Sequence, residues 1–298
     1  MRCADILYSM LTMASRRKWA RSTGNELTRV GQSLAPALRQ FPVTGARTAT
    51  GYRQSRLRGA CSARFADLGV KTSLPPIFAT LGIASMKSKF LAKLDYSEVV
   101  DHYNRRMEVS TRLRTLLKRG KEKDYVNLAL GIDDPYGNYS ADEHTLGPRI
   151  LQRTSPSTIF QLALKLDIVD DDQELRESIY AANIPFLKIS VGSEMAMLLQ
   201  PQRHWVANTR SIWSHLLIKH QSICVANEAL QLYRQGSQEG QMAYKIWSAV
   251  HAEMEPDLQT LASASSLVAK AQGFEPGEAV YIWADAIANA LYELHVGG

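Results

Sequence analysis

From residue 86 to the carboxyl terminus, apolar residues recur with the spacing of an α-helix and almost nowhere alternate as in a strand. Residues three or four positions apart share one face of a helix. In residues 96–119 this spacing brings seven apolar side chains near one face: Val99, Val100, Tyr103, Met107, Leu113, Leu116 and Leu117. Only residues 185–191 alternate with the period of two that a strand requires. The sequence therefore predicts an all-α fold.

Helix boundary signals divide this region into short segments. Ser155 and Pro156 are a cap and a first-turn proline. Glu-Pro pairs at Glu255 and Glu275 are expected to open two of the last helices. The pattern predicts one compact multi-helix domain of about eight or nine helices over residues 86–298. Its core is expected to form around the tryptophans Trp205, Trp213, Trp247 and Trp283.

The net charge of +6 conceals a difference between two parts of the chain. Residues 1–85 contain thirteen Lys and Arg but three acids, which leaves twenty-two bases and twenty-six acids in residues 86–298. Apolar periodicity is weak over residues 1–74. A segment with this composition cannot bury a core, so we expect it to be poorly structured and dispensable for folding.

Three interpretations of the basic amino-terminal segment remain open. Arg- and Ser-rich, acid-poor sequence is typical of an organellar presequence. Clustered arginine also suits a flexible arm that attracts nucleic acid or anionic lipid, because it releases counterions condensed on phosphates. The third interpretation is that the segment is absent from the mature protein, with Met86 as the natural start. Any contact with nucleic acid is expected to involve this arm alone.

The apolar runs and cysteines of the chain also indicate the cellular compartment in which it is expected. The most apolar uncharged run, residues 73–85, is short and contains two prolines, so no membrane span is expected. The cysteines Cys3, Cys61 and Cys224 are odd in number and far apart, which favours a reducing interior over a disulfide framework. We expect a soluble cytoplasmic protein, or one of an organellar matrix if residues 1–74 are a presequence.

Residues 203–220 contain three of the seven histidines and raise the question of a metal site. Treated as one helix, the segment places His204 and His215 on one polar face, but about 16 Å apart along the axis. His220 points away from both. A shared ion is therefore not expected, and neither a metal nor another cofactor is predicted. The accompanying aromatic stripe is interpreted as a packing surface.

Other candidate motifs are incomplete. The acidic loop 131–144 lacks the glycine position and closing glutamate of a calcium loop, and is interpreted as a solvated turn. Ser193 follows a glycine, but the full Gly-x-Ser-x-Gly nucleophile elbow is missing, so Ser193 is interpreted as an N-cap. His251 and Glu255 are spaced to form a surface ion pair. Phosphate-binding and dinucleotide-binding glycine motifs are absent from the sequence.

Two functional hypotheses follow. The first is a non-catalytic helical protein that acts through protein–protein contacts, with a protein partner or a second copy of itself. The second is an enzyme or small-ligand binder with a polar pocket between helices, around residues 204–215 and 285–289. Asp285 is expected to be buried and hydrogen-bonded to Asn208 or Arg210. The pocket of the second hypothesis would be formed by His204, Asn208, Arg210, His215, Asp285 and Asn289.

Overall fold

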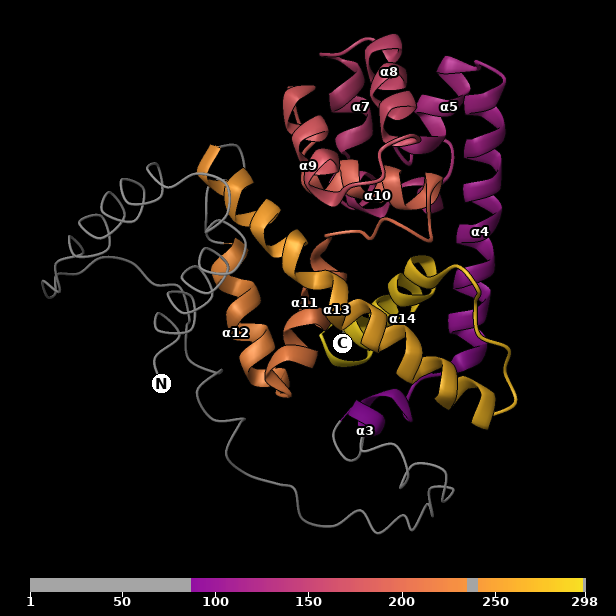
Figure 1. The fold of residues 1–298 in the computed structure, drawn as a ribbon, viewed down its shortest axis with the longest axis vertical. Helices are drawn as coiled ribbons and strands as arrows, with labels where there is room; N and C mark the ends of the chain where they lie inside the picture. Colours follow the sequence, from indigo (N-terminus) through magenta and orange to yellow (C-terminus); the bar gives the residue numbers. More distant parts are fainter. Residues whose placement is uncertain (1–86, 235–240, 297–298) are drawn as a thin grey trace, which may run out of the picture. The chain divides into compact units, whose positions relative to one another are not determined.

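The computed structural model describes residues 87–234 and 241–296, and these residues are all-α (Figure 1). Nine helices of seven or more residues are present, together with three shorter ones and one 3-10 turn. No strand occurs in these two ranges, so the predicted fold class is confirmed. All the described residues belong to one compact unit, residues 74–298. The predictions for residues 1–85, including their boundary, lie outside the described residues.

The helices follow one another with short connections. In chain order they are α3 (Lys87–Leu91), α4 (Tyr96–Lys118), α5 (Glu122–Ala129), η3 (Pro135–Gly137), α6 (Tyr139–Glu143), α7 (Leu146–Leu151), α8 (Pro156–Leu166), α9 (Asp172–Ala181), α10 (Ile189–Leu199), α11 (Thr209–His220), α12 (Ile223–Arg234), α13 (Gln241–Ala271) and α14 (Val280–His295). None of the described helices is long and apolar enough to cross a membrane.

Capping residues define several of these boundaries as the sequence predicts. The Ser155 hydroxyl accepts a hydrogen bond from the Thr158 amide at the start of α8. Gly120 follows α4 with a φ of 64°, a left-handed conformation that favours glycine. The Asp95 carboxylate accepts the Ser97 amide before α4. Such side chains satisfy amide groups that have no partner within the helix.

Three predicted helix starts are wrong. The Glu-Pro pair at Glu275 opens no helix, because it lies in the loop before α14, which begins at Val280. The chain does not begin a helix at Glu255, because α13 continues through Pro256 for 31 residues. Buried Met254 and Leu258 flank the proline, and their packing outweighs the one backbone hydrogen bond that proline removes. The aromatic helix begins at Thr209, not at residue 203, because Asn208 and Ser211 cap it reciprocally.

Residues 185–191 form no strand, and Ser193 is not an N-cap. Helix α10 begins at Ile189 and includes Ser193, which is fully buried. The Ser193 hydroxyl accepts the Ala207 amide at 3.1 Å and donates to the Ser190 carbonyl. It therefore joins α10 to the chain before α11.

The helices pack in two groups that share α4. Helices α5, α8, α9 and α10 form one group, and α11, α12, α13 and α14 form the other (Figure 1). Helix α4 packs against α5 and α10 of the first group and against α14 of the second. Because α4 contacts both groups, its side chains hold them together and line the space between them.

Three of the four predicted core tryptophans are buried. Trp205, Trp213 and Trp283 are each at most 3% exposed, whereas Trp247 is only partly buried. Each buried indole N–H has a partner: Trp205 donates to the His251 carbonyl, Trp213 to Asn227 and Trp283 to Ser265. Trp247 belongs to the amino-terminal part of α13.

Candidate functional site

The predicted pocket residue Asp285 belongs to a buried ionic cluster formed by Arg106, Glu194 and Asp285, hereafter the Arg106 cluster. The Arg106 side chain is fully buried, and its Nη2 lies 2.9 Å from Glu194 Oε1 and 3.4 Å from Asp285 Oδ2. Its Nη1 donates to the Tyr136 carbonyl at 2.6 Å. The cluster thus connects α4, α10 and α14 through one guanidinium group.

Glu194 also fixes the start of α6. Its carboxylate accepts the amides of Tyr139 and Ser140, at 2.8 and 3.1 Å, and the Ser140 hydroxyl at 2.7 Å. Asn138 is buried beside it and donates to the Val191 carbonyl of α10. The loop predicted to be a solvated acidic turn is therefore partly buried, because α10 supplies acceptors for its backbone and side-chain donors.

Asp285 is buried, and charged and polar side chains surround its carboxylate. Burial raises its pKa, while the charges of Arg106 and Arg210 and a hydrogen bond from Asn208 oppose that shift. Asn208, a predicted partner of Asp285, is thus among the groups that act on its pKa. The main cationic partner is Arg106, which the sequence analysis did not identify. Asn289, one turn after Asp285, is partly buried.

Arg106 and Glu194 were not predicted as site residues, but the sequence contains a signal for each of them. Arg106 lies seven residues after Val99 and seven before Leu113, both of which are buried, so it occupies the apolar face of α4. Glu194 is the one charged residue within the apolar run of α10. An ionisable residue at a core position requires a partner, because burial of an unpaired charge is costly.

His102 lies beside the cluster and is neutral at neutral pH. Its ring stacks on Tyr139 and meets the edge of Tyr136, with centroid distances of 5.4 and 5.9 Å. Its Nε2 is buried without a hydrogen bond to any described residue. Burial, with the positive charges of Arg106 and Arg210, lowers the pKa of His102 to about 3.

The two histidines of the predicted pocket have separate partners. His204 Nε2 forms a hydrogen bond of 2.9 Å with the Val169 carbonyl. His215 Nδ1 lies 2.8 Å from the Asp257 carboxylate of α13. Arg210 forms ion pairs with Glu143 and Glu293. The six predicted residues therefore do not converge: Asp285 belongs to the Arg106 cluster, whereas His204, His215 and Arg210 each have separate partners.

His251 does not form the predicted surface ion pair with Glu255. Its side chain is fully buried and stacks on Trp205 at a centroid distance of 4.8 Å. Its Nδ1 lies 2.9 Å from Asp172 of α9. Glu255 instead accepts a hydrogen bond from the Tyr281 hydroxyl. His251 therefore lies on the core side of α13. The sequence pattern did not predict this side, because a helix boundary was expected at Glu255 and Pro256.

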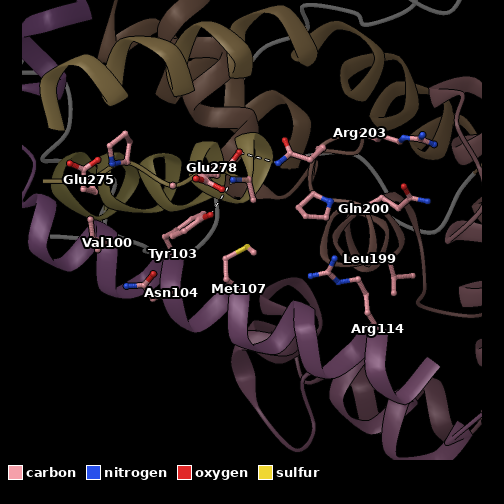
Figure 2. A pocket seen from close by; sticks show the side chains of 15 residues that line it. Val100, Tyr103, Asn104, Met107, Arg114, Leu199, Gln200, Arg203, Glu275 and Glu278 are labelled. Atoms are coloured by element: carbon pink, nitrogen blue, oxygen red, sulfur yellow. Dashed lines mark hydrogen bonds between the residues drawn. The ribbon is translucent and has the colours of Figure 1, made fainter. Parts of the chain in front are cut away.

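An open cleft of about 650 Å³ lies beside α4 and is hereafter the α4 cleft. Its walls are α4, the turn after α10 and the loop 275–279 before α14 (Figure 2). Its lining includes Val100, Tyr103, Asn104, Met107, Arg114, Pro201, Gln202, Glu275 and Glu278. A second cavity, near Leu217 and Leu261, measures only about 20 Å³. None of the six predicted pocket residues lines either cavity.

The loop 275–279 is held closely against α4. A Cβ atom on Gly277 would lie 2.3 Å from the Tyr103 ring, so only glycine permits this approach. The Tyr103 hydroxyl accepts the Ala279 amide at 3.1 Å, and its ring meets the edge of Trp283. The α4 cleft is therefore bounded by a wall that is anchored in the core.

Gly277→Ala tests this anchorage. We expect it to lower the free energy of unfolding by about 1–3 kcal/mol, because the new methyl group overlaps the Tyr103 ring and forces the loop to move. Urea denaturation measures the change, with Glu278→Ala at the neighbouring exposed position as the control. In a Tyr103→Ala background the cost of Gly277→Ala should shrink, since the overlap is gone. Equal costs in both backgrounds would refute the proposed contact.

No group of three or more histidine, cysteine, aspartate or glutamate side chains suited to a metal ion occurs in the described ranges. Comparison with models of protein families, with curated protein sequences and with solved structures found no match to this chain.

Proposed function

We propose that this chain is a binding protein without catalytic activity, and that the α4 cleft receives an extended segment of a partner protein. The observation that carries the proposal is the length of the cleft. Its lining residues on α4 extend from Val100 to Arg114. Fourteen residues of helix correspond to about 21 Å.

An extended peptide matches these dimensions. At about 3.3 Å per residue, a cleft of this length accommodates about six residues of extended chain. The open side of the cleft allows such a segment to continue in both directions. A compact ligand would contact only part of the lining.

The composition of the lining also favours a peptide. Tyr103, Met107 and Pro201 offer apolar surface, and methionine adapts its shape to varied side chains. Asn104 and Gln202 offer amide groups that are able to pair with peptide N–H and carbonyl groups. Since Tyr103 anchors the wall, little conformational entropy is lost when a segment binds.

The Arg106 cluster has a structural role in this proposal. Glu194 accepts backbone amides and lies beside Arg106, Asp285 lies 3.4 Å from the same guanidinium, and neither carboxylate lines the cleft. It holds α4 and α10 in fixed relation to α14. These helices or their adjoining turns supply the walls of the cleft.

Asn104→Trp tests the proposal. Asn104 is exposed on α4 and lines the cleft, so a tryptophan there fills the cleft without disturbing the core. Peptides selected on the full chain from a phage library of random peptides should lose at least about tenfold in affinity, which corresponds to about 1.4 kcal/mol. Fluorescence polarisation of the labelled peptides measures the loss.

Glu108→Trp provides the matched control, because Glu108 is exposed on the same helix but does not line the cleft. It should leave the affinity unchanged. Failure to select any peptide, or equal affinity for both variants, would exclude the α4 cleft as a peptide site.

A further inference from the structure

We propose that the segment bound in the α4 cleft carries a basic side chain at one end and an acidic side chain at the other, about six residues apart. This inference rests on the proposed function and specifies the partner. Its evidence is the distribution of unpaired charges along the cleft.

One end of the cleft is acidic. Glu275 and Glu278 belong to the loop that forms one wall, and Figure 2 shows Glu275 beside Val100 of α4. Both carboxylates are exposed, and neither forms an ion pair with any of the residues described. A lysine or arginine of the bound segment would complement this end.

The opposite end is basic. Arg114 lies near Leu199 in Figure 2, away from Glu275. Within the described part of the chain, Arg114 has no carboxylate partner, and its Nε donates only a long hydrogen bond of 3.4 Å to the Ser110 carbonyl. Arg203 also lines this end, but it is already paired with Asp170. Arg114 is therefore the group that an acidic side chain would reach.

Two neighbouring arginines on α4 differ from Arg114, because each has a carboxylate partner. Arg105 pairs with Asp101 at 2.7 Å, and Arg112 pairs with Asp134 at 3.2 Å. These arginines lie on α4 outside the cleft. The unpaired charges Glu275, Glu278 and Arg114 line the cleft, and in Figure 2 Glu275 and Arg114 lie at its two ends, with Glu278 between them. Such separation favours one orientation of a segment with complementary charges.

Exposed charges contribute modestly to affinity. An exposed ion pair contributes up to about 1 kcal/mol, so two pairs correspond to about a tenfold preference or somewhat more. The apolar middle of the cleft would supply most of the remaining affinity. We therefore expect the charges to determine selectivity and orientation, and to make binding sensitive to salt.

A charge-reversal selection tests the inference. The probe is a phage library of random peptides, selected separately on the full wild-type chain and on the full-length Glu275→Lys/Glu278→Lys variant. Wild type should enrich peptides with Lys or Arg at one end and Asp or Glu at the other. The variant should lose the enrichment of bases and retain that of acids. Selection on the Arg114→Glu variant should lose the enrichment of acids and retain that of bases.

Synthetic peptides from the wild-type selection are then acetylated and amidated, so that side chains and not chain termini supply the charges. Their affinity should fall about tenfold for Glu275→Lys/Glu278→Lys. The control Glu98→Lys/Glu108→Lys changes the net charge equally at exposed positions of α4 outside the cleft, and should have little effect. Melting temperatures establish that each variant is folded.

The outcomes separate this inference from the proposed function. Peptides that are lost with Asn104→Trp but show no charge pattern would overturn the inference and leave the cleft as a peptide site. Peptides insensitive to Asn104→Trp, or no peptides at all, would overturn both. The control Glu98→Lys/Glu108→Lys could also reduce the binding of charged peptides as much as Glu275→Lys/Glu278→Lys does. That result would show that net charge determines the selectivity, and it would overturn the inference.

Discussion

Arg106→Met is expected to lower the free energy of unfolding by about 3–5 kcal/mol, because it leaves Glu194 and Asp285 buried without their cation. The methionine has nearly the volume of arginine, so the loss of packing is small. In a domain of this size the melting temperature should fall by about 10 °C. Urea denaturation, followed by circular dichroism at the helical wavelengths, measures the change.

The neighbouring arginine is the matched control. Arg105→Met removes an exposed ion pair with Asp101 and should cost less than about 1 kcal/mol. The double variant Arg106→Met/Glu194→Gln should be more stable than Arg106→Met alone, since one unpaired charge is then absent. If Arg105→Met and Arg106→Met cost the same, the Arg106 cluster does not stabilise the fold.

Acidification is expected to destabilise the protein through His102. Its pKa is lowered from 6.5 to about 3 in the folded chain, so between these values the unfolded chain binds a proton that the folded chain does not. Stability is therefore present above pH 6.5 and is lost as the pH falls. Between about pH 7.5 and about pH 4 the loss amounts to about 3 kcal/mol.

Burial and the groups that face His102 together determine the sign of this effect. Burial disfavours the imidazolium most, Arg106, Arg210 and Arg105 add to it, and Glu194 only partly opposes them. The raised pKa of Asp285 acts in the other direction, since a carboxyl group with a raised pKa stabilises the fold at low pH. A comparison that removes His102 alone is therefore required.

His102→Phe supplies this comparison, because phenylalanine keeps the ring packing on Tyr139 and cannot be protonated. The difference in unfolding free energy between the variant and wild type should change by about 3 kcal/mol over the same pH interval, in favour of the variant at low pH. A constant difference across the interval would show that His102 titrates normally.

Local features of the chain were predictable from residue order alone. The period of 3.6 determines which residues share a helix face, so the all-α fold and the burial of Trp213 and Trp283 follow from it. Trp205 is buried as well, but it precedes α11 and lies in no helix. Caps such as Ser155 act within one turn, and their partners are therefore visible in the sequence. The Asn208–Ser211 pair was equally visible and would have corrected the start of α11.

Only the tertiary structure decided which residues far apart in the sequence contact one another. Arg106, Glu194 and Asp285 come from three helices separated by some ninety residues each, and periodicity does not specify which buried faces meet. The same holds for Gly277 against Tyr103, a contact that creates the wall of the α4 cleft. Pro256 within α13 shows tertiary packing prevailing over a local stop signal. The physical reason is that local rules act over one helical turn, whereas clefts and buried ion pairs depend on how whole helices pack together.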